Sequence, residues 1–99
     1  MRRLRVRKIA RAEILAAFEW YLERSPAAAE RFLAAVDDAM RRIEEAPERY
    51  PLIRGRLRRV LLERFPYGVY YKVYPSVISV VGVIHGHRHP DTWLRRAAP

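Results

Sequence analysis

The sequence predicts an α+β fold: a two-layer sandwich, in the order β-α-α-β-β-β, with a helical hairpin packed on a small, mostly antiparallel sheet. Two segments with apolar residues at helical spacing fill the first half of the chain, and three short apolar runs separated by turn residues fill the second. Helices with one apolar stripe need a sheet face to cover, so the two halves should form two layers. The 99 residues are expected to form one domain, 1–99.

The first strand is predicted in residues 2–8, "RRLRVRK", because arginines alternate there with Leu4 and Val6. The helix that follows, in residues 9–25, has its apolar side chains at helical spacing. Its expected stripe is Leu15, Phe18 and Leu22, flanked by Ile14 and Tyr21.

A second helix is predicted directly after the first. Ser25 can cap its N-terminus, and Pro26 suits the first helical position, where the missing N–H has no partner to lose. Pro47 should end it. The expected stripe is Phe32, Val36, Met40 and Ile43. Since one residue separates the two helices, they should form a hairpin.

The second half predicts an irregular connector at 46–59 and three strands, at 59–65, 69–74 and 77–85. The last of these, "VISVVGVIH", is apolar on both sides, which indicates a central strand covered on both faces. The long helical crossover allows the first strand to pair in parallel, while the last three form an antiparallel meander. Residues 90–99 read as a short tail with one helical turn.

Four tyrosines lie in or beside the predicted strand at 69–74: Tyr67, Tyr70, Tyr71 and Tyr74. Aromatic side chains can stack on the bases of single-stranded nucleic acid. Tyr70 and Tyr71 are adjacent on a strand and therefore face opposite ways, so the four cannot form one stacking surface. We expect Tyr71 to lie in the core.

Composition excludes several classes of function. The chain has no cysteine, which excludes disulfides, thiolate zinc sites and a cysteine nucleophile. It has no apolar run long enough to cross a membrane, and its start lacks the apolar stretch of a signal peptide. A cytoplasmic protein without a membrane partner is expected.

The net charge of +9 is unevenly distributed. Residues 1–11 carry six basic and no acidic side chains, residues 12–48 carry four basic and nine acidic, and residues 49–64 carry six basic and one acidic. This division suggests one face for a polyanion and another that avoids it. Within the third segment, Arg54, Arg56, Arg58 and Arg59 are candidates to bind the phosphates of a nucleic acid or an acidic protein, the alternative being a solvated charge run.

Three histidines alternate in "VIHGHRHPDTW": His85, His87 and His89. On a strand they share one face, with Cβ atoms about 7 Å apart. No metal site is expected, because neither Asp91 nor another carboxylate is an obvious further ligand. His85 or His87 could act as a general base, with Arg88 steadying a phosphate. Alternatively, His85 closes the strand while Arg88 and Trp93 anchor the tail.

The chain resembles the RelE/ParE superfamily of type II toxin–antitoxin toxins. The resemblance covers nearly the whole sequence: the first strand, the Ser-Pro-capped hairpin, the prolines at 47 and 51, "RRVLLERFPYGVYYKV" and "VVGVIHGHRHPDTWLRR". It implies a bacterial toxin neutralised by a cognate antitoxin that is encoded beside it and wraps around it.

The superfamily has two branches. RelE-like toxins cleave messenger RNA on the ribosome and carry an arginine early in the strand after the bend and a tyrosine near the chain end. The resemblance puts Gly68 at the position of that arginine and Trp93 at the position of that tyrosine. Glycine offers no charge, and the indole of tryptophan has no titratable proton. The ParE-like branch, which poisons DNA gyrase by binding, is the closer resemblance.

The resemblance therefore predicts a gyrase inhibitor with no catalytic residues and no cofactor, which meets DNA only indirectly through its complex. If the chain were a nuclease, the candidate catalytic residues would be Arg64, His85, His87 and Arg88. A third alternative is an inactive relative that regulates DNA together with its antitoxin. Predicted binding residues are Arg54, Arg56, Arg58, Arg59, Arg88 and Trp93.

Overall fold

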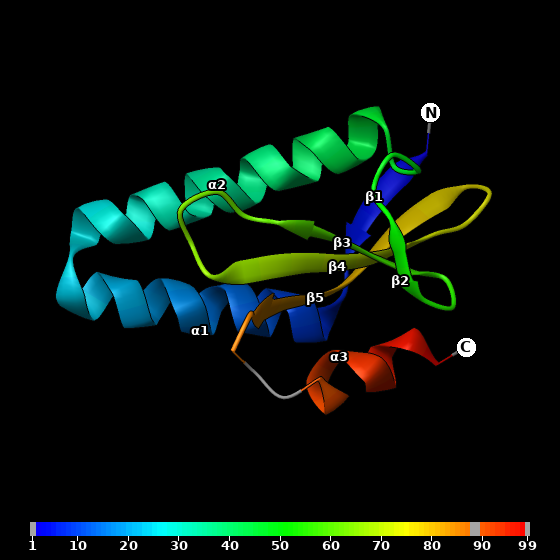
Figure 1. Ribbon diagram of the computed structural model, residues 1–99. Coiled ribbons are helices and arrows are strands. Elements are labelled where there is room, and N and C mark those ends of the chain that lie inside the picture. The colour runs from blue at the N-terminus through cyan, green and yellow to red at the C-terminus, as the bar shows by residue number, and fades with distance from the viewer. Residues whose placement is uncertain (1, 88–89, 99) are drawn as a thin grey trace.

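The computed structural model, which describes residues 2–87 and 90–98, is a five-stranded mixed sheet with two long helices on one face (Figure 1). The strand order is β1-β5-β4-β3-β2, with β1 parallel to β5 and all other pairs antiparallel. The predicted α+β fold is confirmed. The elements are β1 (Arg3–Val6), α1 (Lys8–Arg24), α2 (Pro26–Glu45), β2 (Leu52–Arg54), β3 (Leu57–Leu61), β4 (Tyr67–Val73), β5 (Val77–His85), α3 (Asp91–Leu94) and the 3-10 turn η1 (Arg95–Ala97).

The predicted connector at 46–59 was wrong in one respect, because it contains the edge strand β2. Arg54 pairs with Leu57, so only Gly55 and Arg56 form the turn between β2 and β3. Gly55 has φ 53°, in the left-handed region that a two-residue hairpin turn requires and that glycine adopts at little cost. The same turn moves the start of β3 forward to Leu57.

The helical hairpin forms as its capping residues predict. The Ser25 side chain accepts a hydrogen bond from the Ala28 N–H at 3.2 Å, and Pro26 is the first residue of α2. α2 ends at Glu45, two residues before Pro47. Its buried side chains are Ala29, Phe32, Val36, Ala39 and Ile43, while Met40 is half-buried.

The predicted stripe of α1 was wrong at two of its three positions. Leu15 is 56% exposed and Leu22 is 44% exposed. The side chains that α1 buries fully are Ala10 and Ala17. The contact face of α1 therefore consists of these two alanines together with the half-buried Ile14, Phe18 and Tyr21, which pack against the main core. The larger leucines remain on the outer side.

Tyr71 lies at the centre of the main core, as predicted. Its ring is fully buried, and its hydroxyl donates a hydrogen bond to the Pro47 carbonyl oxygen at 2.6 Å. Burial raises the Tyr71 pKa to about 12, against a smaller lowering by Arg58. The bond ties β4 to the segment that leaves α2.

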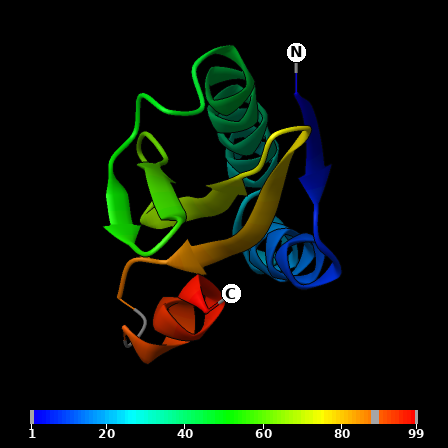
Figure 2. The ribbon, with the colours of Figure 1, turned by 90° about the vertical axis from the view of Figure 1, so that its right-hand side faces the viewer.

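The second face of the sheet is covered by the chain's own C-terminal tail. Leu57, Tyr70 and Ile84 form a smaller buried cluster there, packed against Trp93 and Ala97. In Figure 2 the tail lies on the side of β5 away from α2. β5 is therefore a central strand with both faces covered, as its doubly apolar sequence predicts.

An ion pair that local sequence does not indicate fastens this tail. Nη1 and Nη2 of Arg96 donate to the two carboxylate oxygens of Glu13 in α1, at 2.8 and 2.9 Å. Nη1 also donates to the Val81 carbonyl oxygen at 2.9 Å. The same carboxylate accepts the Val83 N–H at 3.0 Å. The Arg96 and Glu13 side chains are 15% and 20% exposed, so α1, β5 and the tail share one largely buried polar contact.

We expect Tyr71→Phe to destabilise the fold by about 1–2 kcal/mol, because it leaves the half-buried Pro47 carbonyl without its donor. The raised pKa adds a pH test. Stability from the neutral hydroxyl is complete below the ordinary tyrosine pKa of 10.0 and is lost as pH rises toward about 12. Urea unfolding across this range should show a smaller alkaline loss for Tyr71→Phe than for Tyr74→Phe, a half-buried control. Identical pH profiles for both variants would contradict it.

We expect Glu13→Gln to destabilise the fold by about 2–3 kcal/mol, because it leaves the Arg96 cation largely buried without a counter-charge. Glu45→Gln is the matched control. Its carboxylate is 62% exposed and lies 3.8 Å from Arg41, so its loss should cost about 0.5 kcal/mol or less. Chemical denaturation measures both, and equal effects would show that the Glu13 pair has no special structural weight.

Candidate functional site

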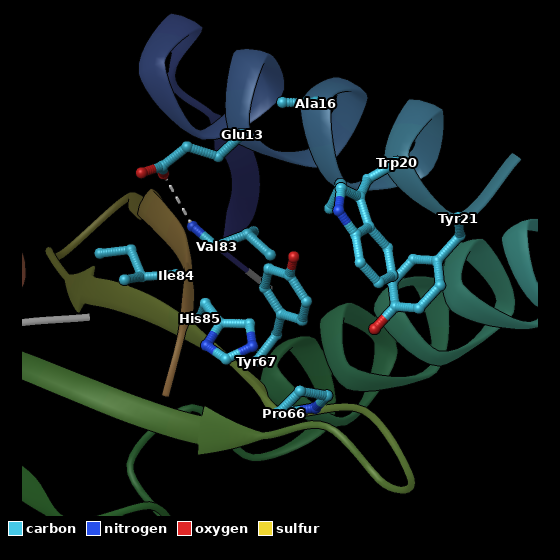
Figure 3. Close-up of a pocket in the computed structure, with 10 residues that line it drawn as sticks. Glu13, Ala16, Trp20, Tyr21, Pro66, Tyr67, Val83, Ile84 and His85 are labelled. Atoms are coloured by element: carbon cyan, nitrogen blue, oxygen red, sulfur yellow. Dashed lines mark hydrogen bonds between the residues drawn. The ribbon is translucent and has the colours of Figure 1, made fainter. Parts of the chain in front are cut away.

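A groove runs between α1, the β3–β4 loop and the end of β5 (Figure 3). Ala16 and Ala17 of α1 line one side and Pro66 and Tyr67 the other, with Val83, Ile84 and His85 of β5 between them. Trp20 stands at its rim and is 50% exposed. A half-exposed tryptophan beside small side chains is typical of a surface that receives an apolar partner.

Trp20 is held in place from both sides. The Arg24 guanidinium carbon lies 3.7 Å above the centre of its ring, a cation–π contact, and Tyr21 meets it edge-on at 5.0 Å between centroids. Tyr21 itself packs against Phe32 and Phe65 of the core. Burial raises the Tyr21 pKa, with a further contribution from the neighbouring Tyr67. The Tyr21 hydroxyl beside the groove therefore stays neutral at physiological pH.

His85 ends β5 at the floor of the groove. Its ring meets Tyr67 edge-on at 5.1 Å, and its Nδ1 accepts the His87 backbone N–H at 3.0 Å. This bond leaves only Nε2 of His85 for contacts with another molecule. His87 is exposed, with its ring centroid 5.1 Å from that of His85. The predictions on Arg88 and His89 lie outside the described residues.

The groove contains little of the chemistry that cleaves RNA. Among its lining residues, all of them within the described part of the chain, the one carboxylate is Glu13, which is paired with Arg96, and none is an arginine or lysine. Cleavage needs a positive group near the scissile phosphate as well as a base. His85 supplies a titratable ring without a neighbouring cation among these lining residues.

Arg64 lies in a different depression. It occupies the β3–β4 loop with φ 66°, an unusual left-handed conformation for a residue with a side chain. It faces α2, where Arg31, Asp38 and Arg42 line the same hollow. The structure therefore does not bring Arg64 and His85 into one cavity.

The four arginines of the predicted basic run separate to different surroundings. Arg54 and Arg56 are exposed at the β2–β3 turn. Arg58 donates to the carbonyl oxygens of Glu48 and Tyr50, at 3.2 and 2.5 Å. The Arg59 guanidinium lies 5.9 Å from the Tyr70 ring, on the opposite face of β3. The Arg56 guanidinium carbon also lies 5.5 Å from the centre of the Tyr74 ring. Binding of a partner by these four arginines stays a prediction.

Trp93 also has a packing role. Its ring stacks on Tyr70, with centroids 6.0 Å apart and an angle of 23° between the planes. Gly68 packs tightly as well, since a Cβ atom there would lie 3.2 Å from the Arg59 side chain and the Tyr70 ring. The two places that depart from the RelE-like pattern are thus occupied by core packing.

Within residues 2–87 and 90–98, no three His, Cys, Asp or Glu side chains gather closely enough to hold a metal ion. No helix in the described part of the chain is both long and apolar enough to span a membrane.

Comparison with known families identifies the family to which the chain belongs. Residues 4–90 match the family model described as "ParE toxin of type II toxin-antitoxin system, parDE". The chain belongs to the ParE toxin family. It is a toxin of a type II toxin–antitoxin system, as its resemblance to the RelE/ParE superfamily indicates.

Individual relatives agree with this assignment. The chain is 30% identical over 91 residues to Toxin ParE2 of Mycobacterium tuberculosis, in two strains, covering 91% of this chain and 87% of the relative. A solved structure of the chromosomal ParDE TA system from P. aeruginosa has the same fold. It matches with a TM-score of 0.64 and 21% identity, covering 86% of this chain and 96% of that one.

The sequence favours packing roles for Trp20 and Tyr21, with a place in a groove that receives the antitoxin as the alternative. It did not locate the other walls of this ParE toxin's groove, although a signal was present. Ile9, Glu13, Ala16 and Trp20 recur at helical spacing on one side of α1. That side is distinct from the Leu15 side, and Ile9 and Trp20 are each 50% exposed. A second apolar stripe on one helix indicates a surface beyond the one that packs on the sheet.

Proposed function

We propose that this ParE-family toxin inhibits DNA gyrase by binding to it, without catalytic residues of its own. The observation that carries the proposal is the separation of Arg64 from His85, which leaves the His85 groove without a basic side chain among its described lining residues. Protein binding needs no such constellation. Because gyrase acts on the chromosome, the proposal places the toxin in the bacterial cytoplasm.

We further propose that a cognate antitoxin neutralises the toxin by occupying the Trp20 groove. The family is defined by a paired toxin and antitoxin, which supplies the class of partner. The groove supplies the recognition, since its walls are apolar and its one carboxylate is already paired. An apolar helix or an extended segment of the antitoxin fits that chemistry.

The ribosome-dependent nuclease is the second candidate. One contact favours it: His85 keeps Nε2 free beside Tyr67, so an acid–base group does face the groove. An inactive relative that only regulates DNA with its antitoxin is the third. A gyrase assay separates the first candidate from the second. A chain that affects neither gyrase nor messenger RNA but still binds its antitoxin would favour the third.

With ATP, purified gyrase and closed circular plasmid, the toxin should abolish supercoiling and cause linear DNA to accumulate. The double variant His85→Ala/His87→Ala should keep its potency within about threefold, because binding does not use a general base. Gel resolution of supercoiled, relaxed and linear DNA is the readout. Unchanged gyrase activity from a folded toxin would shift the function to the ribosome. There, the same double variant should lose orders of magnitude in rate.

Trp20→Ala should weaken binding of the antitoxin encoded beside the toxin by about 2 kcal/mol, roughly thirtyfold in Kd, because it removes the anchor of the groove. Leu61→Ala is the control, since Leu61 is 63% exposed on β3 and does not line the groove. Isothermal titration calorimetry measures both affinities. A loss of similar size in both variants, or in neither, would locate the antitoxin elsewhere.

A further inference from the structure

The strongest concentration of charge in the chain folds onto one edge of the sheet. Residues 1–11 carry six basic and no acidic side chains. They form β1, an edge strand, and the first turn of α1. We call the exposed residues Arg3, Arg5, Arg7 and Lys8 the basic edge.

The pleat of β1 sorts its side chains to two faces. Leu4 and Val6 pack against the main core under the helices. Arg3 and Arg5 alternate with them and therefore extend from the opposite face. On a strand their Cβ atoms lie about 7 Å apart, so two guanidinium groups project side by side toward solvent.

Arg7 is fixed beside them by the neighbouring strand. Its Nε donates to the Ser79 hydroxyl at 2.7 Å, and Ser79 is almost fully buried. Ser79 pairs in register with Arg5 of β1 and with Lys72 of β4. The Lys72 ammonium is held in turn by the Ala98 carbonyl oxygen at 2.7 Å. Arg3, Arg5, Arg7 and Lys72 thus lie on the same part of the sheet. Hydrogen bonds orient two of them, Arg7 and Lys72.

Within the part of the chain that the structure describes, the basic edge has no carboxylate partner, whereas other arginines do. Arg2 pairs with Glu48 and Arg96 pairs with Glu13. Among residues 2–87 and 90–98, by contrast, no carboxylate lies within 4.0 Å of a nitrogen of Arg3, Arg5, Arg7 or Lys8. Its positive charge therefore remains available to another molecule.

The arrangement is also unfavourable for the helix that follows. Arg7 is the N-cap of α1 without a side-chain capping bond, and the first turn contains Lys8 and Arg11 but no acidic residue. Cations at the positive end of a helix dipole lower helix stability, where carboxylates would raise it. The fold keeps the cations at this position despite that effect, which favours a role in binding.

We propose that the basic edge binds the phosphate backbone of duplex DNA directly, in contrast to the expectation from the sequence that the toxin meets DNA only through its complex. Which DNA this is rests on the proposed function: it is the segment held by gyrase while the toxin is bound. The exposed side chains of β1 on this face are arginines, whereas a protein interface has an apolar core. A row of guanidinium groups suits the repeated charges of a phosphate backbone, without reading bases.

The test uses the free toxin and a fluorescently labelled duplex of arbitrary sequence, with anisotropy measured between about 50 and 200 mM salt. Arg3→Gln/Arg5→Gln should weaken binding on the order of tenfold at the lowest salt and reduce the slope of log K against log salt by about 2. Arg31→Gln/Arg41→Gln is the matched control. Both of its residues are exposed on α2, which covers the face of the sheet opposite Arg3 and Arg5, and it removes the same net charge. Its slope should stay within about 0.5 of the parent.

A charge-conserving variant, Arg3→Lys/Arg5→Lys, should keep the slope, and circular dichroism should show all variants folded. Equal loss in the two glutamine variants would overturn the proposal, because net charge alone would then explain binding. Tighter binding to a polyglutamate peptide than to the duplex, with the same dependence on Arg3 and Arg5, would assign the basic edge to an acidic protein instead.

The gyrase assay keeps this inference separate from the proposed function. A toxin that binds duplex DNA through Arg3 and Arg5 but leaves gyrase unaffected upholds the basic edge and refutes gyrase as target. A toxin that binds no duplex, and whose Arg3→Gln/Arg5→Gln variant poisons gyrase with unchanged potency, upholds gyrase as target and refutes DNA binding by the basic edge.

Discussion

The ion pair between Glu13 and Arg96 solves a backbone problem that the short first strand creates. β1 pairs with β5 only from Val77 to Val80, so the rest of β5 has no strand beside it on that side. Buried backbone groups need hydrogen-bond partners. Here the Glu13 carboxylate accepts the Val83 N–H and the Arg96 guanidinium donates to the Val81 carbonyl. Side chains from α1 and the tail therefore complete the sheet where the strand stops, and they join both sheet faces at that point.

The groove follows from this replacement of a neighbouring strand by side chains. Beyond Val80 a helix rather than a strand lies beside β5, and its small residues Ala16 and Ala17 leave space that a paired strand would fill. The ion pair also neutralises the one carboxylate in that space. What remains is an apolar cleft with a tryptophan at its rim and a histidine at its floor. Such a cleft suits recognition of a protein segment better than charge-dependent chemistry on a phosphate.

Local patterns predicted most of the fold, because most of it is locally encoded. Ser25 and Pro26 placed the hairpin turn, and the doubly apolar run at 77–85 marked the central strand. The predicted core stripe of α1 was wrong because helical spacing alone does not show which apolar stripe faces the sheet. The structure buries the alanines and leaves Leu15 and Leu22 exposed. The groove could not be read from one segment, since it joins Trp20, Tyr67 and His85 from three elements. Glu13 and Arg96, 83 positions apart, leave no local pattern at all.

The basic edge ends at Lys8, the first residue of α1, whereas the groove uses α1 only from Glu13 onward. An antitoxin segment seated in the groove need not cover Arg3 or Arg5. If the antitoxin blocks the protein target alone, the neutralised toxin keeps its charge for DNA, and the pair can bind DNA through both partners. The uneven charge along the chain then acquires a physical meaning. In the proposed binding mode the basic edge would face the polyanion, and the acidic residues 12–48 would be the part of the chain that avoids it.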